Sequence, residues 1–378
     1  MKKIVVACDS FKGSLSSREV AEALAAGIRE ADPHCEVHSI PLADGGEGTL
    51  EALVEGLGGH YVEVEVSDPL GRPIRACYGR VDGGETAVVE LARASGLTLL
   101  SPEERDPWRA TTYGFGELIA HALRSGCRRL VLGIGGSATN DGGVGMLRAL
   151  GFRFLDAAGS ELIGGGEVLE AIEKIDASQC LSELQGVEIR VACDVRNPLC
   201  GAQGAAAVYG PQKGADPALV ERLDRGLRHF AEVVEQYNGL QMADLPGAGA
   251  AGGVGGALVA LLGARLERGI EWLLQMLRFE SQIEGADCII TGEGCIDRQT
   301  LMGKLPMGVL QVARRMKLPC IALAGRVELC KELLESGFAQ ICGVTPEGQP
   351  LSEAMRPEVA RENLRRAIHG ILASDRTT

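Results

Sequence analysis

The stretch KIVVACDSFKGSLSSREV, residues 3–20, predicts a buried strand, a polar loop and the start of a helix. The β-branched run at 3–8 is typical of a strand inside a parallel sheet. Ser16 followed three residues later by Glu19 forms a capping box, and we expect the helix it starts to reach about residue 30. The chain therefore opens with a strand–loop–helix unit.

Four more apolar runs follow the same order near the two ends of the chain, at residues 36–42, 287–290, 319–323 and 339–344. Simple βα repeats of this kind form a doubly wound parallel α/β sheet. We predict one discontinuous five-stranded parallel domain built from residues 1–65 and 285–378. Its expected strand order is 2-1-3-4-5, with the switch point between the first strand and the strand at 287–290.

The middle of the chain, residues 66–284, has a different pattern and is predicted to be a large inserted α/β domain with a mixed sheet. Segments of alternating polarity run from about residue 61 to residue 89 and are separated by turn signals such as Asp68-Pro69, which is typical of antiparallel strands. A buried strand at 129–133 and another at 187–193 are separated by helical stretches. We expect the active site in the cleft between the two domains.

Composition and charge exclude several classes of function. The net charge of −13 argues against nucleic acid as a partner, because such proteins carry basic patches that neutralise phosphate. We find no apolar run long enough for a membrane span and no signal peptide, so we expect no membrane partner. The 12 cysteines include no CxxC pair, and the 6 histidines form no metal pair. We expect reduced thiols and a cytoplasmic protein, and homo-oligomerisation is left open.

Glycine is enriched, with 52 residues among 378, and it gathers in polar loops that follow the predicted strands. These loops are 9–14, 43–49, 135–143, 192–201 and 291–304. One such loop alone would be read as a turn that needs a positive φ. Five of them at equivalent strand ends predict a site for a small polyanion, because open α/β sheets bind ligands beyond the carboxyl ends of their strands.

The loop GGSATNDGG at 135–143 offers consecutive backbone N–H groups and hydroxyls, as a phosphate cradle requires. The chain contains no Walker A sequence. Gly133, Gly135 and Ala138 fit a GxGxxA pattern, but Asn140 to Gly143 delay the helix that a dinucleotide site needs at once. We assign substrate or phosphate binding to Asp9, Ser10, Lys12, Gly13, Asp44, Gly45, Gly46, Gly135, Gly136, Ser137, Ala138, Thr139, Asn140 and Asp141.

The carboxylates of these loops could supply a base for a hydroxyl group and ligands for Mg²⁺. Asp194 is our first choice for the base and Asp297 is its rival; Glu293 and Asp297 are the metal candidates. Among the loop lysines 12, 213 and 304, we give Lys304 a catalytic role in neutralising transferred phosphate. No histidine lies in these loops, so phosphoryl transfer fits better than a Ser-His-Asp or Cys-His mechanism.

The chain resembles the bacterial glycerate kinase family in eight motifs that cover essentially its whole length. They are ACDSFKGSLS (7–16), PLADGGEGT (41–49), SDPLGRPI (67–74), GIGGSATNDGG (133–143), VACDVRNPLCG (191–201), YGPQKGA (209–215), GAAGGVGGAL (249–258) and TGEGCIDRQTLMGKLP (291–306). The resemblance implies ATP-dependent phosphorylation of D-glycerate to 2-phosphoglycerate with Mg²⁺, and a flavodoxin-like domain built from both chain ends. Two alternatives remain: an NAD-dependent hydroxy-acid dehydrogenase that uses the Gly133 pattern, and a non-catalytic protein that binds a sugar acid.

Overall fold

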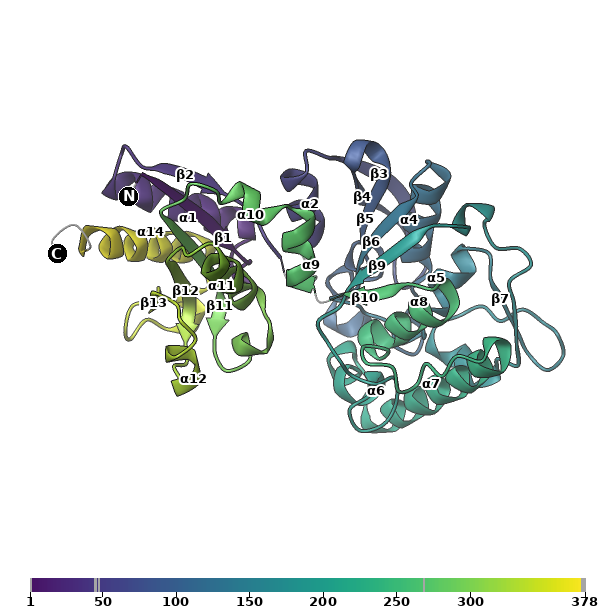
Figure 1. Ribbon diagram of the computed structural model, residues 1–378. Coiled ribbons are helices and arrows are strands. Elements are labelled where there is room, and N and C mark those ends of the chain that lie inside the picture. The colour runs from purple at the N-terminus through teal and green to yellow at the C-terminus, as the bar shows by residue number, and fades with distance from the viewer. Residues whose placement is uncertain (1, 44–45, 47, 268, 375–378) are drawn as a thin grey trace. The chain divides into compact units, whose positions relative to one another are not determined.

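The computed structural model describes residues 2–43, 46, 48–267 and 269–374 (Figure 1). The chain divides into two compact units. Unit 1 contains the residues up to 44 and those from 270 onward, and unit 2 contains residues 45–269. Both junctions lie earlier in the chain than the 65/66 and 284/285 boundaries expected from the sequence. Among the described residues, no helix has the length and apolar character needed to cross a membrane.

Unit 1 is built around a five-stranded parallel sheet in the order β13-β12-β11-β1-β2. The strands are β1 (Lys3–Cys8), β2 (Glu36–Ser39), β11 (Cys288–Ile296), β12 (Cys320–Val327) and β13 (Gln340–Gly343). Strand β1 pairs with β11 on one side and with β2 on the other, so the chain order reverses there. The predicted order 2-1-3-4-5 and its switch point are confirmed.

The helices of unit 1 are α1 (Ser17–Ala31), α9 (Gly269–Met276), α10 (Phe279–Gln282), α11 (Leu305–Arg315), α12 (Lys331–Leu334), α13 (Leu351–Ala354) and α14 (Pro357–Ser374). The capping box between Ser16 and Glu19 is present at the start of α1. Helices α1 and α14 lie side by side, and a Cβ on Gly27 would come within 2.4 Å of the carbonyl oxygen of Arg365. Glycine at position 27 therefore permits this close helix contact.

Strands β11 and β12 are longer than the sequence predicts. The predicted loop at 291–304 does not begin at Thr291, because β11 continues to Ile296. The added residues pair in parallel with β12, with Glu293 opposite Ala324 and Cys295 opposite Arg326. Polar and glycine residues enter this strand extension because a neighbouring strand supplies the hydrogen bonds, which local sequence pattern does not reveal.

Unit 2 contains a six-stranded mixed sheet in the order β10-β9-β6-β5-β4-β3, which confirms the predicted mixed sheet. Strands β3, β4 and β5 pair antiparallel, and β5, β6, β9 and β10 pair parallel. The strands are β3 (His60–Ser67), β4 (Pro73–Val81), β5 (Thr86–Glu90), β6 (Arg129–Gly133), β9 (Glu188–Ala192) and β10 (Arg265–Glu267), with a separate hairpin-like pair β7 (Arg153–Leu155) and β8 (Lys174–Asp176).

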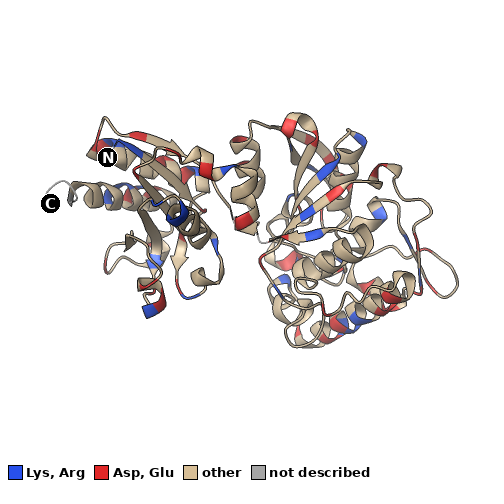
Figure 2. Cartoon of the chain, in the orientation of Figure 1, with Lys and Arg blue, Asp and Glu red and all other residues tan. Residues whose placement is uncertain are grey.

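The helices of unit 2 pack against this sheet and against one another. They are α2 (Thr49–Gly56), α3 (Ala92–Ser95), α4 (Tyr113–Arg124), α5 (Val144–Ala149), α6 (Ala205–Tyr209), α7 (Pro217–Asn238) and α8 (Val254–Leu262). Helix α7 starts at an Asp216 cap and buries Leu227 and Phe230 in the core. Acidic and basic residues are interspersed along the same helix (Figure 2).

Candidate active site

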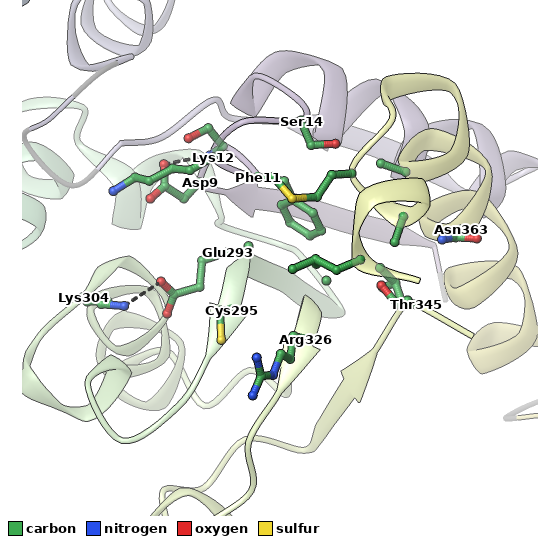
Figure 3. A pocket seen from close by; sticks show the side chains of 18 residues that line it. Asp9, Phe11, Lys12, Ser14, Glu293, Cys295, Lys304, Arg326, Thr345 and Asn363 are labelled. Carbon is green, nitrogen blue, oxygen red and sulfur yellow. Dashed lines mark hydrogen bonds and ion pairs between the residues drawn. The ribbon is translucent and has the colours of Figure 1, made fainter. Parts of the chain in front are cut away.

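Unit 1 has a cavity of about 300 Å³ at the carboxyl ends of β1 and β11 (Figure 3). Parallel strands bring these two ends together, since Cys8 pairs with Gly292. Five predicted site residues line the cavity: Asp9, Ser10, Lys12, Glu293 and Lys304. Gly13 lies in the same loop with a φ of 78°. Two sequence motifs that are about 280 residues apart in the chain therefore form one site.

Glu293 is the central charged group of this cavity. It is only 8% exposed. It lies in the extension of strand β11 and not, as the sequence predicts, in a loop. Its Oε1 accepts a hydrogen bond of 2.7 Å from the Thr300 hydroxyl, and its Oε2 is 3.3 Å from Lys304 Nζ. Asp9 is buried to a similar degree, and its Oδ1 accepts the backbone N–H of Ser10 at 2.7 Å. The cavity thus has carboxylates and ammonium groups at one end.

Asp297 has a different position from Glu293. Its Oδ1 accepts the N–H of Gln299 at 2.7 Å, and its own N–H donates to the Thr300 hydroxyl at 3.1 Å. This turn orients the Thr300 hydroxyl toward Glu293. Within the described part of the chain, no three His, Cys, Asp or Glu side chains form a cluster that could hold a metal ion. The assignment of a metal to Glu293 and Asp297 stays a prediction.

In unit 2, the loop after β6 is held by a buried carboxylate. Asp141 is fully buried and accepts the N–H and the hydroxyl of Thr112, both at 2.8 Å. It also accepts the N–H groups of Gly143 at 3.0 Å and Gly145 at 3.1 Å. Burial raises the pKa of Asp141 above its ordinary value, while these donors oppose that rise. Asp141 therefore fixes the loop and the start of α5, and does not face solvent.

A buried lysine also supports the same loop. Lys213 is 2% exposed and donates from Nζ to Ser137 Oγ at 2.7 Å and to the Thr139 carbonyl oxygen at 2.6 Å. Removal from water lowers its pKa to about 7. From the sequence, Lys213 is recognisable only as a loop cation. Its place between Gly210 and Gly214 was the one available signal of a constrained site.

Two neighbouring side chains in this loop contain polar atoms that lack a protein partner. Both side-chain atoms of Asn140, and the Thr139 hydroxyl, are buried and accept or donate no hydrogen bond within the described residues. Buried polar groups are nearly always paired, and an unpaired one costs about 1–3 kcal/mol. Such atoms are typical of positions where a bound ligand or an ordered water completes the hydrogen bonding.

The rest of the predicted unit 2 residues lie at the same edge of its sheet. Strand β9 pairs with β6, with Ala192 opposite Gly133. Asp194 and the 134–143 loop therefore both follow the carboxyl ends of adjacent strands. Asp194 is exposed, and its Oδ1 accepts the N–H of Gly269 at 2.8 Å. Gly135 and Gly136 are also exposed.

The structure thus gathers the predicted residues into two groups, one in each unit. Ser137, Ala138, Thr139 and Asn140 are buried members of the unit 2 group. Gly46 lies against Gly135, where an added Cβ would come within 3.1 Å of the Gly46 Cα. Asp44 and Gly45 lie outside the described residues. The expected cleft between the domains stays a prediction.

The loop geometry also bears on the dinucleotide alternative. Strand β6 ends at Gly133 and helix α5 begins only at Val144. A dinucleotide-binding fingerprint requires a helix to open within the glycine loop, so that its N-terminus faces the pyrophosphate. The GxGxxA pattern is therefore not followed by the required helix, and the geometry does not favour this alternative.

Comparison with known proteins identifies a family. The model of the glycerate kinase family matches residues 4–374. Glycerate kinase of Bacillus subtilis (strain 168) is 46% identical over 373 residues, which are 98% of this chain and 97% of that protein. Glycerate 2-kinase of Escherichia coli (strain K12) is 45% identical, with the same coverage. A crystal structure described as that of a "putative glycerate kinase 2" from Salmonella typhimurium LT2 has a TM-score of 0.87 and 45% identity, and the match covers 100% of this chain and 98% of that one.

Proposed function

The chain belongs to the glycerate kinase family, and we propose that it transfers the terminal phosphoryl group of ATP to the 2-hydroxyl of D-glycerate, giving 2-phosphoglycerate and ADP. One structural observation carries the proposal: Lys12, Lys304, Asp9 and Glu293 line one end of a single cavity. Phosphoryl transfer needs charge neutralisation and positioning and needs no covalent nucleophile on the protein. The twelve cysteines are all free, which suits the reducing cytoplasm that we propose as its location.

In this proposal Lys304 and Lys12 neutralise the charge on the transferred phosphoryl group. Lys304 is the N-cap residue of α11, and its Nζ lies 3.3 Å from Glu293 Oε2. The pairing holds the ammonium group at the cavity while leaving it able to turn toward a phosphate oxygen. Ser10 and Gly13 belong to the same loop as Lys12, and in this proposal they keep the backbone of that loop close to the phosphates.

The residues at this end of the cavity fit a magnesium ion. Mg²⁺ is usually held by one or two carboxylates together with substrate phosphates and water. Glu293 and Asp9 are carboxylates that line the cavity, so they would hold the ion there. When bound, Mg²⁺ neutralises the charge of the phosphates. Asp297 is the less well supported ligand, because Gln299 already donates to its Oδ1.

We assign D-glycerate to the edge of the unit 2 sheet. Its carboxylate and hydroxyls would accept hydrogen bonds from, or lie against, the backbone N–H groups of the exposed residues Gly135 and Gly136. Asp194 follows the adjacent strand and would accept the proton of the 2-hydroxyl as the general base. The bond between Asp194 and the Gly269 N–H orients this carboxylate.

The test is a coupled assay with ATP, Mg²⁺ and D-glycerate, with the product identified by phosphorus NMR. We expect 2-phosphoglycerate and ADP in equal amounts. Tight NAD binding without ATP turnover would instead support the dehydrogenase, and glycerate binding without transfer would support a binding protein. Lys304→Met should lower kcat about 10²-fold or more, whereas Lys331→Met, which removes an 82% exposed lysine of the same unit, should not.

A further inference from the structure

The cavity of unit 1 is more apolar than glycerate alone would need. Beyond its charged end it is lined by apolar side chains: Phe11, Val344, Leu351, Ala354, Met355 and Ala360. In glycerate every carbon atom carries oxygen, so an apolar wall would offer it nothing. A ligand with both a charged part and an extended apolar face fits the lining better.

The polar groups of the cavity stand at opposite sides of this apolar wall. Figure 3 shows Lys12, Glu293 and Lys304 on one side and Thr345 and Asn363 on the other, with Phe11 between them. Asn363 is 7% exposed, and its Nδ2 donates to the side-chain oxygen of Gln349 at 2.8 Å. The side of the cavity at Thr345 and Asn363 is therefore polar but carries no charge.

We infer, on the basis of the proposed function, that this cavity binds the purine nucleoside of ATP. The base lies against Phe11, Leu351 and Met355, and the phosphates extend toward Lys12 and Lys304. A purine has a flat apolar face for such a wall and a polar edge for Thr345 and Asn363. The volume of about 300 Å³ lies at the lower end of the range for small-molecule pockets. The site would belong to unit 1 alone.

A matched pair of variants tests the apolar wall. Leu351 is 63% exposed and lines the cavity, so Leu351→Asn should leave the fold intact. Leu334 is 65% exposed in the same unit and does not line the cavity, so Leu334→Asn is the control. Calorimetry on the full chain would measure the Kd of ADP and of inorganic tripolyphosphate. We expect Leu351→Asn to weaken ADP binding about fivefold or more while tripolyphosphate binding stays unchanged.

Other outcomes would overturn the inference. An unchanged Kd for ADP, or equal weakening of ADP and tripolyphosphate, would mean that the wall does not contact the base. A raised KM for D-glycerate with unchanged ADP binding would assign the cavity to the acceptor. The wild-type protein could phosphorylate glycerate with any of these results. A wrong location for the base is therefore distinguishable from a wrong proposed function.

Photolabelling gives an independent measurement of the same site. With 8-azido-ATP we expect the label in peptides spanning residues 345–363, with competition by ATP and none by D-glycerate. A label confined to residues 45–269 would place the base in unit 2 and refute the inference.

Discussion

Lys213 makes the stability of unit 2 depend on pH in a calculable way. Burial lowers the pKa of this lysine from 10.5 to about 7, because the ammonium form loses its hydration. Between these values the unfolded chain holds a proton that the folded chain has released. Unfolding therefore takes up a proton, and raising the pH favours the folded state. At roughly 1.4 kcal/mol per pH unit, the whole interval corresponds to at most about 5 kcal/mol.

The variant Lys213→Met should remove this dependence. From pH 7 to pH 9, we expect the free energy of unfolding of the wild type to rise by about 2 kcal/mol relative to the variant. The comparison between the two proteins cancels the titration of other groups. Lys174→Met removes an exposed lysine of the same unit. Its free energy of unfolding should change with pH in the same way as that of the wild type.

The two tryptophans allow unit 2 to be measured separately. Trp108 lies in unit 2 and packs against a small core cluster that includes Ala215, two residues after Lys213. Trp272 lies in unit 1. In a Trp272→Phe background, fluorescence during urea unfolding reports on Trp108 alone. If the difference between wild type and Lys213→Met stays constant from pH 7 to pH 9, Lys213 is not titrating in this range and the reasoning is refuted.

Three further outcomes are expected. Gly136→Val places a β-branched residue at a φ of 72°, with a backbone strain of about 1–2 kcal/mol; substrate binding should fall further than stability does, and equal losses would indicate a purely structural turn. Asp141→Asn sets an amide nitrogen against a buried N–H donor, so the free energy of unfolding measured with denaturant should fall by about 2–3 kcal/mol. An unchanged denaturation midpoint would contradict this. Asp194→Asn should lower kcat by ~10²-fold with little change in the KM for ATP. Excess Mg²⁺ should not rescue Asp194→Asn, and a rescue would make Asp194 a metal ligand instead of the base.

The sequence by itself determined the architecture of unit 1. Its strands are short apolar runs bounded by turns, and the capping box at Ser16 and Glu19 marks where α1 begins. These are local signals, and the topology of βα units follows from them because the connections between parallel strands have one hand. The loops at the carboxyl ends of β1 and β11 could be named in advance for the same reason.

The tertiary structure decided which of those residues meet and which are buried. Glu293 lies in a strand because β12 pairs with it, and Thr300 and Lys304 contact it only after the chain turns back. Lys213 loses its water because the loop containing Ser137 folds over it from 76 positions earlier in the chain. Pairing and burial depend on residues far away in sequence, and no local pattern of residue types records them.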